Sequence, residues 1–375
     1  MGLFLNKGLK KIINPRAILA LAVTGMVSAL AWGCAFFGEK IYTSTIFAMD
    51  TVMELQIAGG RDFTPEAEEY IRRLEKELSV TDASSEIARL NADGEGELSE
   101  EVGSILLQAK DVCDRTDGAL DITIYPVLKA WGFTTGEYRV PSDEEIAGLL
   151  SSVDYKGIDI EVEENAADSG AGSGSGDGDS AGSTVKVGLS EGMQVDLGSV
   201  AKGYTGTAVA DMLKSEGVTH ALLNLGGNVQ CIGSKLDGNP WKVAIKSPFP
   251  DSASGMIGVV DADDVAIITS GGYERYFEED GKRYWHILDP ATGRPAENGL
   301  VSVTIVGKDG LLCDGLSTAL FVKGLDEAIE QYRQSDDFEA IFVTEDREVY
   351  VTEGLADKFA LTSEYHDLPL QVITK

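Results

Sequence analysis

The chain has 375 residues, of which 43% are hydrophobic and 25% charged, and its 62 acidic and 31 basic side chains give a formal net charge of −31. These proportions are ordinary for a globular protein, so we expect a sizeable buried core and exclude a collagen-like or wholly disordered chain. Affinity for nucleic-acid phosphates depends on Lys and Arg, so the acidic balance excludes nucleic acid as a partner. Polyanionic substrates are disfavoured too, unless a cation mediates.

The N-terminus has the opposite charge. Its first 16 residues carry four basic side chains and no acidic one, and the apolar run 17–37 follows. This layout is typical of an export signal or a membrane anchor, with a buried core helix as the alternative. Cys34 stands where a bacterial lipoprotein signal carries its acylated cysteine, so we expect either a lipid anchor at Cys34 or a spanning helix. Positive residues stay inside, so the remainder is predicted to be extracytoplasmic and attached to the cell membrane.

Strands and helices alternate along the rest of the chain. Residues 41–57 are rich in β-branched and apolar side chains and predict one or two strands. Ser99 is a candidate helix cap, and Ser142 with Glu145 forms a capping-box pattern. Helices are predicted at 65–79, 100–115, 146–150 and near 199–215, 314–322 and 325–333. The mixed order points to an α+β fold in which mixed sheets are packed with helices.

Residues 161–184 contain six acids, no base, and little besides Gly, Ser and Ala. Such a segment cannot form a core and is predicted to be a disordered, solvated loop. It interrupts two strand-like stretches, 157–162 and 184–189, so we interpret it as an insertion at the tip of a hairpin. The predicted organisation is an anchor at 1–37, one domain over 41–360 containing the insertion, and a C-terminal tail at 361–375.

Several standard sites lack support. No G-x-G-x-x-G occurs, and neither Gly-Lys pair is followed by Ser or Thr, so Rossmann and P-loop interpretations fail. Three histidines are too few to favour a multi-histidine zinc or copper centre. The cysteines beyond Cys34 show no C-x-x-C spacing, which argues against a disulfide framework or a zinc knuckle. Cys113 falls on the apolar face of a predicted helix and is expected to be an inert, buried thiol.

Oxygen chemistry remains. Asp314, Ser317 and Thr318 are spaced i, i+3, i+4, which places a carboxylate and two hydroxyls on one helix face. Few hard oxygen donors, completed by substrate phosphates, are how Mg²⁺ is usually held. The alternative is that Asp314 caps the helix and the hydroxyls bond back to it.

Two further clusters carry polar groups. In the stretch Asp196 to Tyr204, a helix start with exposed amides and Lys202 could bind an anion while Asp196 accepts hydrogen bonds; a capped helix with a surface lysine is the alternative. His286 precedes a D-P-x-T-G turn and is either a packed histidine or a general base.

Taken in order, these segments resemble the FAD:protein FMN transferase family, called ApbE-like, from about residue 47 to 351. The resemblance rests on eight ordered blocks: AMDT (48–51), SSEIARLN (84–91), GALDIT with P-x-x-x-x-W-G-F (118–133), DLGSVAKGY (196–204), NLGGN (224–228), TSG-x-Y (269–273), H-x-x-D-P-x-T-G (286–293) and D-G-L-S-T-A (314–319). It implies an ApbE/T-fold-like architecture with a flavin cleft between two subdomains.

The resemblance also implies an activity. Family members are exported, often as lipoproteins, and use Mg²⁺ to transfer FMN from FAD onto a Thr or Ser of an acceptor flavoprotein, releasing AMP. Flavin contacts are implied at Met49, Ala119, Leu120, Asp121, Asp196, Lys202 and the backbone of Leu288. Metal ligands are implied at the Ser199 carbonyl, Asp314, Ser317 and Thr318. We expect Asp314 and Lys202 to act in catalysis, and His286 to take the acceptor's proton because an unperturbed histidine titrates near neutral pH.

Two other functions remain open from sequence. With water as the nucleophile, the same site would be an FAD pyrophosphatase that yields FMN and AMP. A non-catalytic flavin-binding lipoprotein would instead store or deliver FAD. The departures from the family's usual residues are Asp50 for Gly, Leu120 for Phe, Asn228 for an acid and Thr81 for a frequent Tyr, and they concern the packing of the flavin ring more than the diphosphate chemistry.

Overall fold

A computed structural model describes residues 39–163 and 184–375, which belong to one compact unit. The predicted anchor at 1–37 and most of the predicted loop at 161–184 lie outside the described residues. Within the described part of the chain, no helix is both long and apolar enough to cross a membrane.

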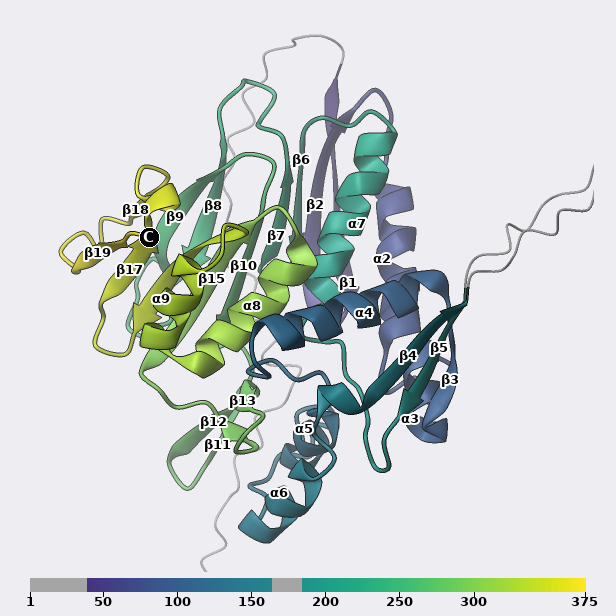
Figure 1. Ribbon diagram of the computed structural model, residues 1–375. Helices are drawn as coiled ribbons and strands as arrows, with labels where there is room; N and C mark the ends of the chain where they lie inside the picture. Colours follow the sequence, from purple (N-terminus) through teal and green to yellow (C-terminus); the bar gives the residue numbers. More distant parts are fainter. Residues whose placement is uncertain (1–38, 164–183) are drawn as a thin grey trace, which may run out of the picture. The chain divides into compact units, whose positions relative to one another are not determined.

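A nine-stranded sheet forms the centre of the unit (Figure 1). Its strands, in spatial order, are β1 (Lys40–Ala48), β2 (Thr51–Gly59), β6 (Ala221–Leu225), β7 (Asn228–Ile232), β10 (Ala266–Gly271), β15 (Leu300–Gly307), β16 (Phe338–Thr344), β17 (Val349–Thr352) and β19 (Leu370–Ile373). All neighbours are antiparallel except β17 and β19. The prediction of a separate tail at 361–375 is therefore wrong, because β19 lies in that segment and extends the sheet.

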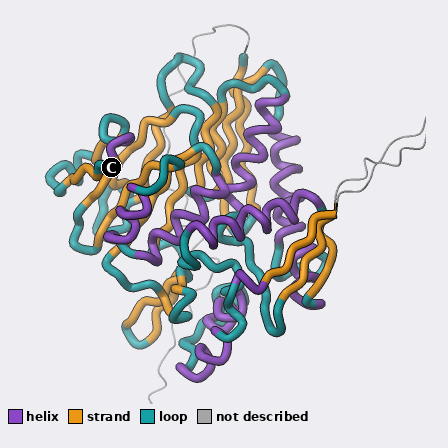
Figure 2. The backbone as a smooth tube through the Cα atoms, viewed as in Figure 1, coloured by secondary structure: helices purple, strands orange, loops and turns teal. Residues whose placement is uncertain are grey.

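Helices cover one face of this sheet, and Figure 2 shows them as a layer in front of the strands. They are α2 (Thr64–Leu78), α7 (Ala201–Ser215), α8 (Gly310–Lys323) and α9 (Leu325–Arg333), while α4 (Glu100–Arg115) packs on α8 and α3 (Glu86–Asp93) lies against α2 and β3 (Glu95–Leu98). The small sheet of β8 (Trp241–Lys246), β9 (Met256–Ala262) and β18 (Phe359–Leu361) packs on the other face through a second apolar core. Strand β10 shows the alternation this requires, since Ala266 and Ile268 join the helix-side core and Ile267 joins the other.

Smaller elements surround this sandwich. A second small sheet consists of β3 (Glu95–Leu98), β4 (Ile158–Glu163) and β5 (Thr184–Leu189), and β4 pairs with β5 as far as Glu163 and Thr184. The two strands that flank the predicted insertion are thus confirmed as hairpin partners. The remaining elements are α5 (Tyr125–Trp131), α6 (Asp143–Leu150), β11 (Tyr276–Glu279), β12 (Lys282–Trp285), β13 (Leu288–Asp289), β14 (Arg294–Pro295) and two short 3₁₀ turns, η1 (Tyr155–Gly157) and η2 (Glu353–Leu355).

The predicted helices are confirmed, with one shift that matters. Ser99 and Ser142 cap α4 and α6 by accepting hydrogen bonds from Val102 N and Glu145 N. Helix α8 begins at Gly310 with Asp309 as its cap, so Asp314 lies in its interior and the capping alternative for Asp314 is wrong. Cys113 is fully buried in the helix-side core, which raises the pKa of its thiol to about 12 and confirms the prediction of an inert thiol.

Candidate functional site

The close approach of α7 and α8 builds the centre of the candidate site. A Cβ added at Gly203 would lie 2.0 Å from the Gly310 carbonyl oxygen, and one added at Gly310 would lie 2.2 Å from the Gly203 carbonyl oxygen. Only glycines permit this contact. It brings the Gly203 amide within 2.8 Å of Asp314 Oδ2, which accepts its hydrogen bond.

This hydrogen bond leaves the Ser199 carbonyl free. In a continued helix the Gly203 amide would donate to the carbonyl four residues earlier, which is that of Ser199. It donates to Asp314 instead, and no described residue bonds to the Ser199 carbonyl oxygen. Asp314 thus accepts from one amide and the Ser199 carbonyl lacks a hydrogen-bond partner within the described residues, while the metal role of both stays a prediction.

Burial governs the charge state of Asp314. Its side chain is 5% exposed, and burial raises the pKa of its carboxyl, while the Lys202 charge and the Gly203 amide oppose that rise. The Asn228 amide beside this carboxyl also lowers its pKa, yet Asn228 Nδ2 makes no hydrogen bond of normal length and angle. A buried carboxylate with an unsatisfied amide beside it costs free energy unless a ligand satisfies both groups.

The two predicted hydroxyls occupy different positions. Ser317 is fully buried and donates to the Asp314 carbonyl one turn back, at 2.8 Å. Thr318 is half-buried and makes no such bond; its Oγ1 lies 3.3 Å from Ser270 Oγ on β10. Ser270 Oγ also lies 2.7 Å from Ser317 Oγ. Back-bonding, the alternative weighed for both hydroxyls, therefore holds for Ser317 alone.

Lys202 and Arg275 supply the positive charge. The charge of Lys202 lowers the pKa of Asp314, Asp196 and His286. Arg275 acts on Asp196 and His286 in the same direction, and its guanidinium is 3.3 Å from the carboxylate of exposed Asp50. Burial raises the pKa of Asp196, whose Oδ1 accepts from Gly198 N at 2.8 Å.

The start of α7 offers fewer free hydrogen-bond donors to an anion than predicted. Its first four amides are those of Ala201, Lys202, Gly203 and Tyr204. Three of them are occupied, because Ala201 and Tyr204 bond to backbone carbonyls and Gly203 bonds to Asp314. Only the Lys202 amide makes no hydrogen bond within the described residues. One free amide and one ammonium at the positive end of a helix remain for an anion.

His286 is neutral at pH 7. Burial, reinforced by the nearby charges of Arg275 and Lys202, lowers the pKa of its imidazole to about 4, so the expectation of titration near neutral pH is wrong. Nδ1 lies 3.1 Å from the Arg275 carbonyl oxygen. A carbonyl can only accept, so in the neutral ring Nδ1 carries the proton and Nε2 keeps a free lone pair.

The residues implied in flavin contacts lie in several loops. Met49 and Asp50 form the two-residue turn between β1 and β2, with φ of 48° and 59°, and Met49 N donates to Glu75 Oε1 at 2.6 Å. Leu288 is buried in a small core with Trp131, so its backbone is the part left for a ligand.

The segment of Ala119, Leu120 and Asp121 is largely occupied by the protein itself. Leu120 is buried in the helix-side core, and Ala119 packs against that core. Asp121 accepts from Thr123 N and Oγ1 at 2.8 and 2.6 Å, and from Tyr155 N at 3.1 Å. The Asp121 carboxylate therefore holds the turn. The Ala119 and Leu120 amides donate to Thr116 and the Asp121 carbonyl accepts from Ile124 N, so the implied flavin contact of this segment stays a prediction.

Gly203, Ser270 and Arg275 join the site without having been predicted there. Ser270 and Arg275 lie in or beside the TSG-x-Y block, and Gly203 lies in DLGSVAKGY, so the blocks that carry the family resemblance were the available signal. Their partners are 47 to 225 residues away in the chain, beyond the reach of any local spacing.

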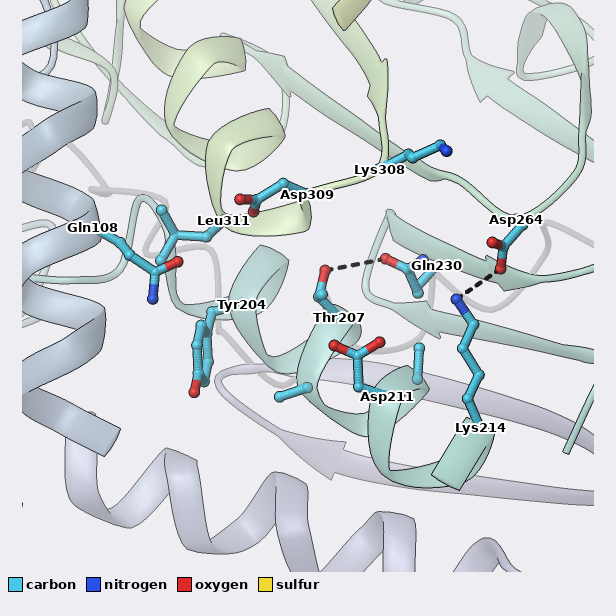
Figure 3. A pocket seen from close by; sticks show the side chains of 12 residues that line it. Gln108, Tyr204, Thr207, Asp211, Lys214, Gln230, Asp264, Lys308, Asp309 and Leu311 are labelled. Carbon is cyan, nitrogen blue, oxygen red and sulfur yellow. Dashed lines mark hydrogen bonds and ion pairs between the residues drawn. The ribbon is translucent and has the colours of Figure 1, made fainter. Parts of the chain in front are cut away.

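A separate hollow of about 440 Å³ runs along α7 beside the start of α8 (Figure 3). In its wall, Lys214 pairs with Asp264 at 2.8 Å and Thr207 Oγ1 lies 3.4 Å from Gln230 Oε1. Two lysines and three aspartates line it, and none of the predicted site residues does. Its charges are mixed, so it shows no preference for an anion or a cation.

Comparison with known proteins identifies this arrangement. Residues 49–342 match the ApbE family, a span that contains every predicted site residue. The chain belongs to the ApbE family. The family resemblance expected from sequence is thereby confirmed.

Named relatives agree with the family match. The FAD:protein FMN transferase of Vibrio cholerae is 32% identical over 303 residues, covering 78% of this chain and 84% of the relative. That of Klebsiella pneumoniae is 35% identical over 288 residues, covering 76% and 83%. The predicted enzyme class, FAD:protein FMN transferase, is confirmed.

Solved structures support the fold. The ApbE protein of Thermotoga maritima matches with a TM-score of 0.72 at 31% identity, covering 84% of this chain and 98% of that one. The apo form of the Pseudomonas stutzeri flavinyl transferase ApbE matches with a TM-score of 0.69 at 28% identity, covering 89% and 98%. The predicted α+β fold of ApbE type is confirmed, and the flavin cleft between two subdomains stays a prediction.

Proposed function

We propose that this enzyme uses Mg²⁺ to transfer FMN from FAD to a Thr or Ser hydroxyl of an exported acceptor flavoprotein, with release of AMP. The observation that carries the proposal is the buried Asp314 carboxylate, which accepts from the Gly203 amide, together with a Ser199 carbonyl to which no described residue bonds. Membership of a family whose named relatives are FAD:protein FMN transferases supplies the reaction class.

The donors at this point suit Mg²⁺. Asp314, the Ser199 carbonyl and Thr318 offer oxygen only, and the described residues contain no group of three or more His, Cys, Asp or Glu arranged to hold a metal. Mg²⁺ is commonly held by one or two carboxylates together with water and substrate phosphates. Ser317, the fourth predicted ligand, is fully buried and bonds to Ser270 as well as to the Asp314 carbonyl, so we give it a supporting role.

The bound ion would neutralise charge on the FAD diphosphate as AMP departs. The chain's own groups do the rest. The Lys202 ammonium and amide hold the diphosphate at the start of α7, where the Val200 cap has no side-chain hydrogen bond to compete. The charges of Arg275 and Lys202 both lower the pKa of Asp196, so these three side chains set the local charge that the diphosphate would meet.

The proton step falls to His286. The acceptor oxygen forms a bond to the FMN phosphorus, the bond from that phosphorus to the AMP oxygen breaks, and the acceptor's proton goes to Nε2 of the neutral imidazole. The Nδ1–H bond to the Arg275 carbonyl fixes the tautomer and aims the ring. A transition state that is loose at phosphorus needs only late proton removal, so a weak base suffices.

The test compares wild type with Asp314→Ala in cells that lack the native gene. With wild type, a denaturing gel should show flavin fluorescence on an acceptor protein, and purified enzyme should release AMP from FAD when Mg²⁺ and a cell extract containing that acceptor are present. Asp314→Ala should remain folded and lose both signals. Equal labelling by the variant would refute the metal assignment, and free FMN without labelled protein would indicate a pyrophosphatase.

We also propose that the enzyme is attached to the membrane and works outside the cytoplasm. The support is the basic and apolar N-terminal sequence with Cys34. Cys34→Ala distinguishes the two anchors: it should release a lipoprotein into the soluble fraction and leave a spanning protein in the membrane. Recovery of the wild type from the cytoplasmic fraction would contradict both.

A further inference from the structure

Three hydroxyls from β10 and α8 form a continuous series of hydrogen bonds that ends at the Asp314 carbonyl. Ser270 comes from β10, and Ser317 and Thr318 come from α8. The oxygen–oxygen distances are 2.7 Å from Ser270 to Ser317 and 3.3 Å from Ser270 to Thr318. Ser270 lies two residues beyond Ile268 and so points to the same helix-side face of the sheet, which is why it reaches α8.

The direction of proton donation along these hydroxyls follows from the last acceptor, the Asp314 carbonyl. Each hydroxyl has a single proton to donate. Ser317 donates to the Asp314 carbonyl, which can only accept, so the bond between Ser270 and Ser317 must use the Ser270 proton. The bond between Thr318 and Ser270 must then use the Thr318 proton. The order of donation is Thr318 to Ser270, Ser270 to Ser317, and Ser317 to the backbone.

We propose that Ser270 is a positioning residue for the cation. Ser270 accepts the Thr318 proton, and this turns the lone pairs of Thr318 Oγ1 away from the sheet and toward Asp314. This inference rests on the proposed metal role of Asp314. Residues 314 and 318 are four apart on α8 and share a face, so an oxygen oriented this way points to the space beside the carboxylate. A hydroxyl can bind a cation only through a lone pair, and an acceptor for its proton keeps that lone pair free.

Without Ser270 the Thr318 proton has another acceptor nearby. A threonine in a helix commonly donates to the carbonyl four residues back, which here is that of Asp314. That carbonyl already accepts the helix bond from Thr318 N and a second bond from Ser317 Oγ, so the Thr318 hydroxyl would share it with Ser317. Ser270→Ala should therefore allow Thr318 to rotate toward its own helix and withdraw its oxygen from the cation.

The experiment titrates flavin-free full-length protein with Mn²⁺ and follows the electron paramagnetic resonance signal of the free ion. Ser270→Ala should raise the dissociation constant about 10- to 150-fold, the equivalent of one lost polar contact with a charged centre. Ser270→Thr keeps the hydroxyl and should bind within about threefold of wild type. Thr318→Val should weaken binding similarly, and the double variant should be no weaker than Thr318→Val alone, because Ser270 acts through Thr318.

Thr269→Val is the matched control. Thr269 is the neighbour of Ser270 on β10, points to the opposite face, and forms a hydroxyl pair with Thr304 at 2.8 Å. It should lose stability without changing Mn²⁺ affinity. A Ser270→Ala variant that melts earlier but binds Mn²⁺ like wild type would overturn the positioning role, as would additive losses in the double variant.

Asp314→Ala separates this inference from the proposed function. If wild type and Asp314→Ala bind Mn²⁺ equally, the metal site itself is wrong. If only Asp314→Ala loses Mn²⁺ and Ser270→Ala does not, the metal site stands and the role of Ser270 falls. Should Ser270→Ala fail to fold, Ser270→Cys provides the same comparison with a thiol, a weaker acceptor, and unchanged affinity in that variant would count against the role.

Discussion

Gly203 and Gly310 meet backbone to backbone, and the contact sets how closely α7 approaches α8. Any side chain on either residue would lie within 2.2 Å of the other's carbonyl oxygen. The same contact brings the Gly203 amide to Asp314. The packing of α7 on α8 and the hydrogen bond to Asp314 therefore depend on the same two glycines.

Gly203→Ala should separate the two helices and break the bond to Asp314. We expect the free energy of unfolding to fall by about 1–3 kcal/mol through overpacking, with loss of FMN transfer. Gly206→Ala, one turn along the same helix, is the control: its Cβ would lie 3.3 Å from Gln230 Cβ, and the gain in helix propensity offsets the crowding. Urea unfolding of both variants measures the difference, and equal stability would contradict the close contact.

His286 should titrate far below the range usual for histidine. Burial and the two nearby cations lower its pKa to about 4, so the ring stays neutral down to about pH 5. Lys202→Met removes one positive charge that disfavours imidazolium and should raise the pKa. Imidazole resonances in NMR, assigned with His286→Gln, measure both values; a midpoint near 6.5 in the wild type would contradict the burial.

The same shift predicts a pH dependence of stability. The His286 pKa is lower in the folded protein than in the unfolded chain, so the unfolded chain binds the proton first as pH falls. Between about pH 6.5 and 4, His286 should therefore destabilise the fold by up to about 1.4 kcal/mol per pH unit relative to His286→Gln. Urea midpoints of the two proteins at pH 7 and pH 5 test this, and parallel changes would refute it.

The turn at Met49 and Asp50 should favour glycine over alanine at its second position. Both residues have positive φ, as a two-residue hairpin turn requires, and Asp50 is highly exposed, so its ion pair with Arg275 contributes little. We expect Asp50→Gly to be about 1 kcal/mol more stable than Asp50→Ala. Thermal unfolding of the two variants is the measurement, and the reverse order would argue against the turn geometry.

The insertion should be dispensable. Glu163 and Thr184 are directly paired at the end of the β4–β5 hairpin, so Asn-Gly can replace residues 164–183. Shortening the closed loop should stabilise the fold by up to about 2 kcal/mol and leave FMN transfer unchanged. A Gly-Ser segment of equal length should match the wild type in urea unfolding. Lost transfer in the shortened form alone would assign the segment a function.

Sequence periodicity predicted the elements that have one polar face. Helices α2 and α4 match their predicted ranges within one residue, and the hairpin of β1 and β2 extends the predicted strand region 41–57 by one residue at its start and two at its end. Helix α8 was predicted four residues too late because its first turn, like most of its length, is buried on every side. A helix without a polar face gives no periodic signal at its start. Helices α3 and α5 were missed because neither has the capping-box pattern that revealed the equally short α6.

In the candidate site too, sequence predicted the local relations and missed the long-range ones. The spacing of Asp314, Ser317 and Thr318 predicted their common helix and face, because that relation is local. It could not predict that both hydroxyls meet Ser270 on β10 while only Ser317 bonds back to its own helix. That difference depends on Ser270, which is 47 residues from Ser317 in the chain and is brought close only by the fold.

The order of strands in the large sheet places Lys40 and Ile373 on its two outermost strands (Figure 1). Eight strand spacings separate them, a distance of roughly 38 Å before twist shortens it. A fluorescent donor near residue 40 and an acceptor on the C-terminal residues would therefore act as a ruler across every strand of the sheet. Energy transfer between them would report the integrity of the whole enzyme without labelling any residue of the catalytic centre.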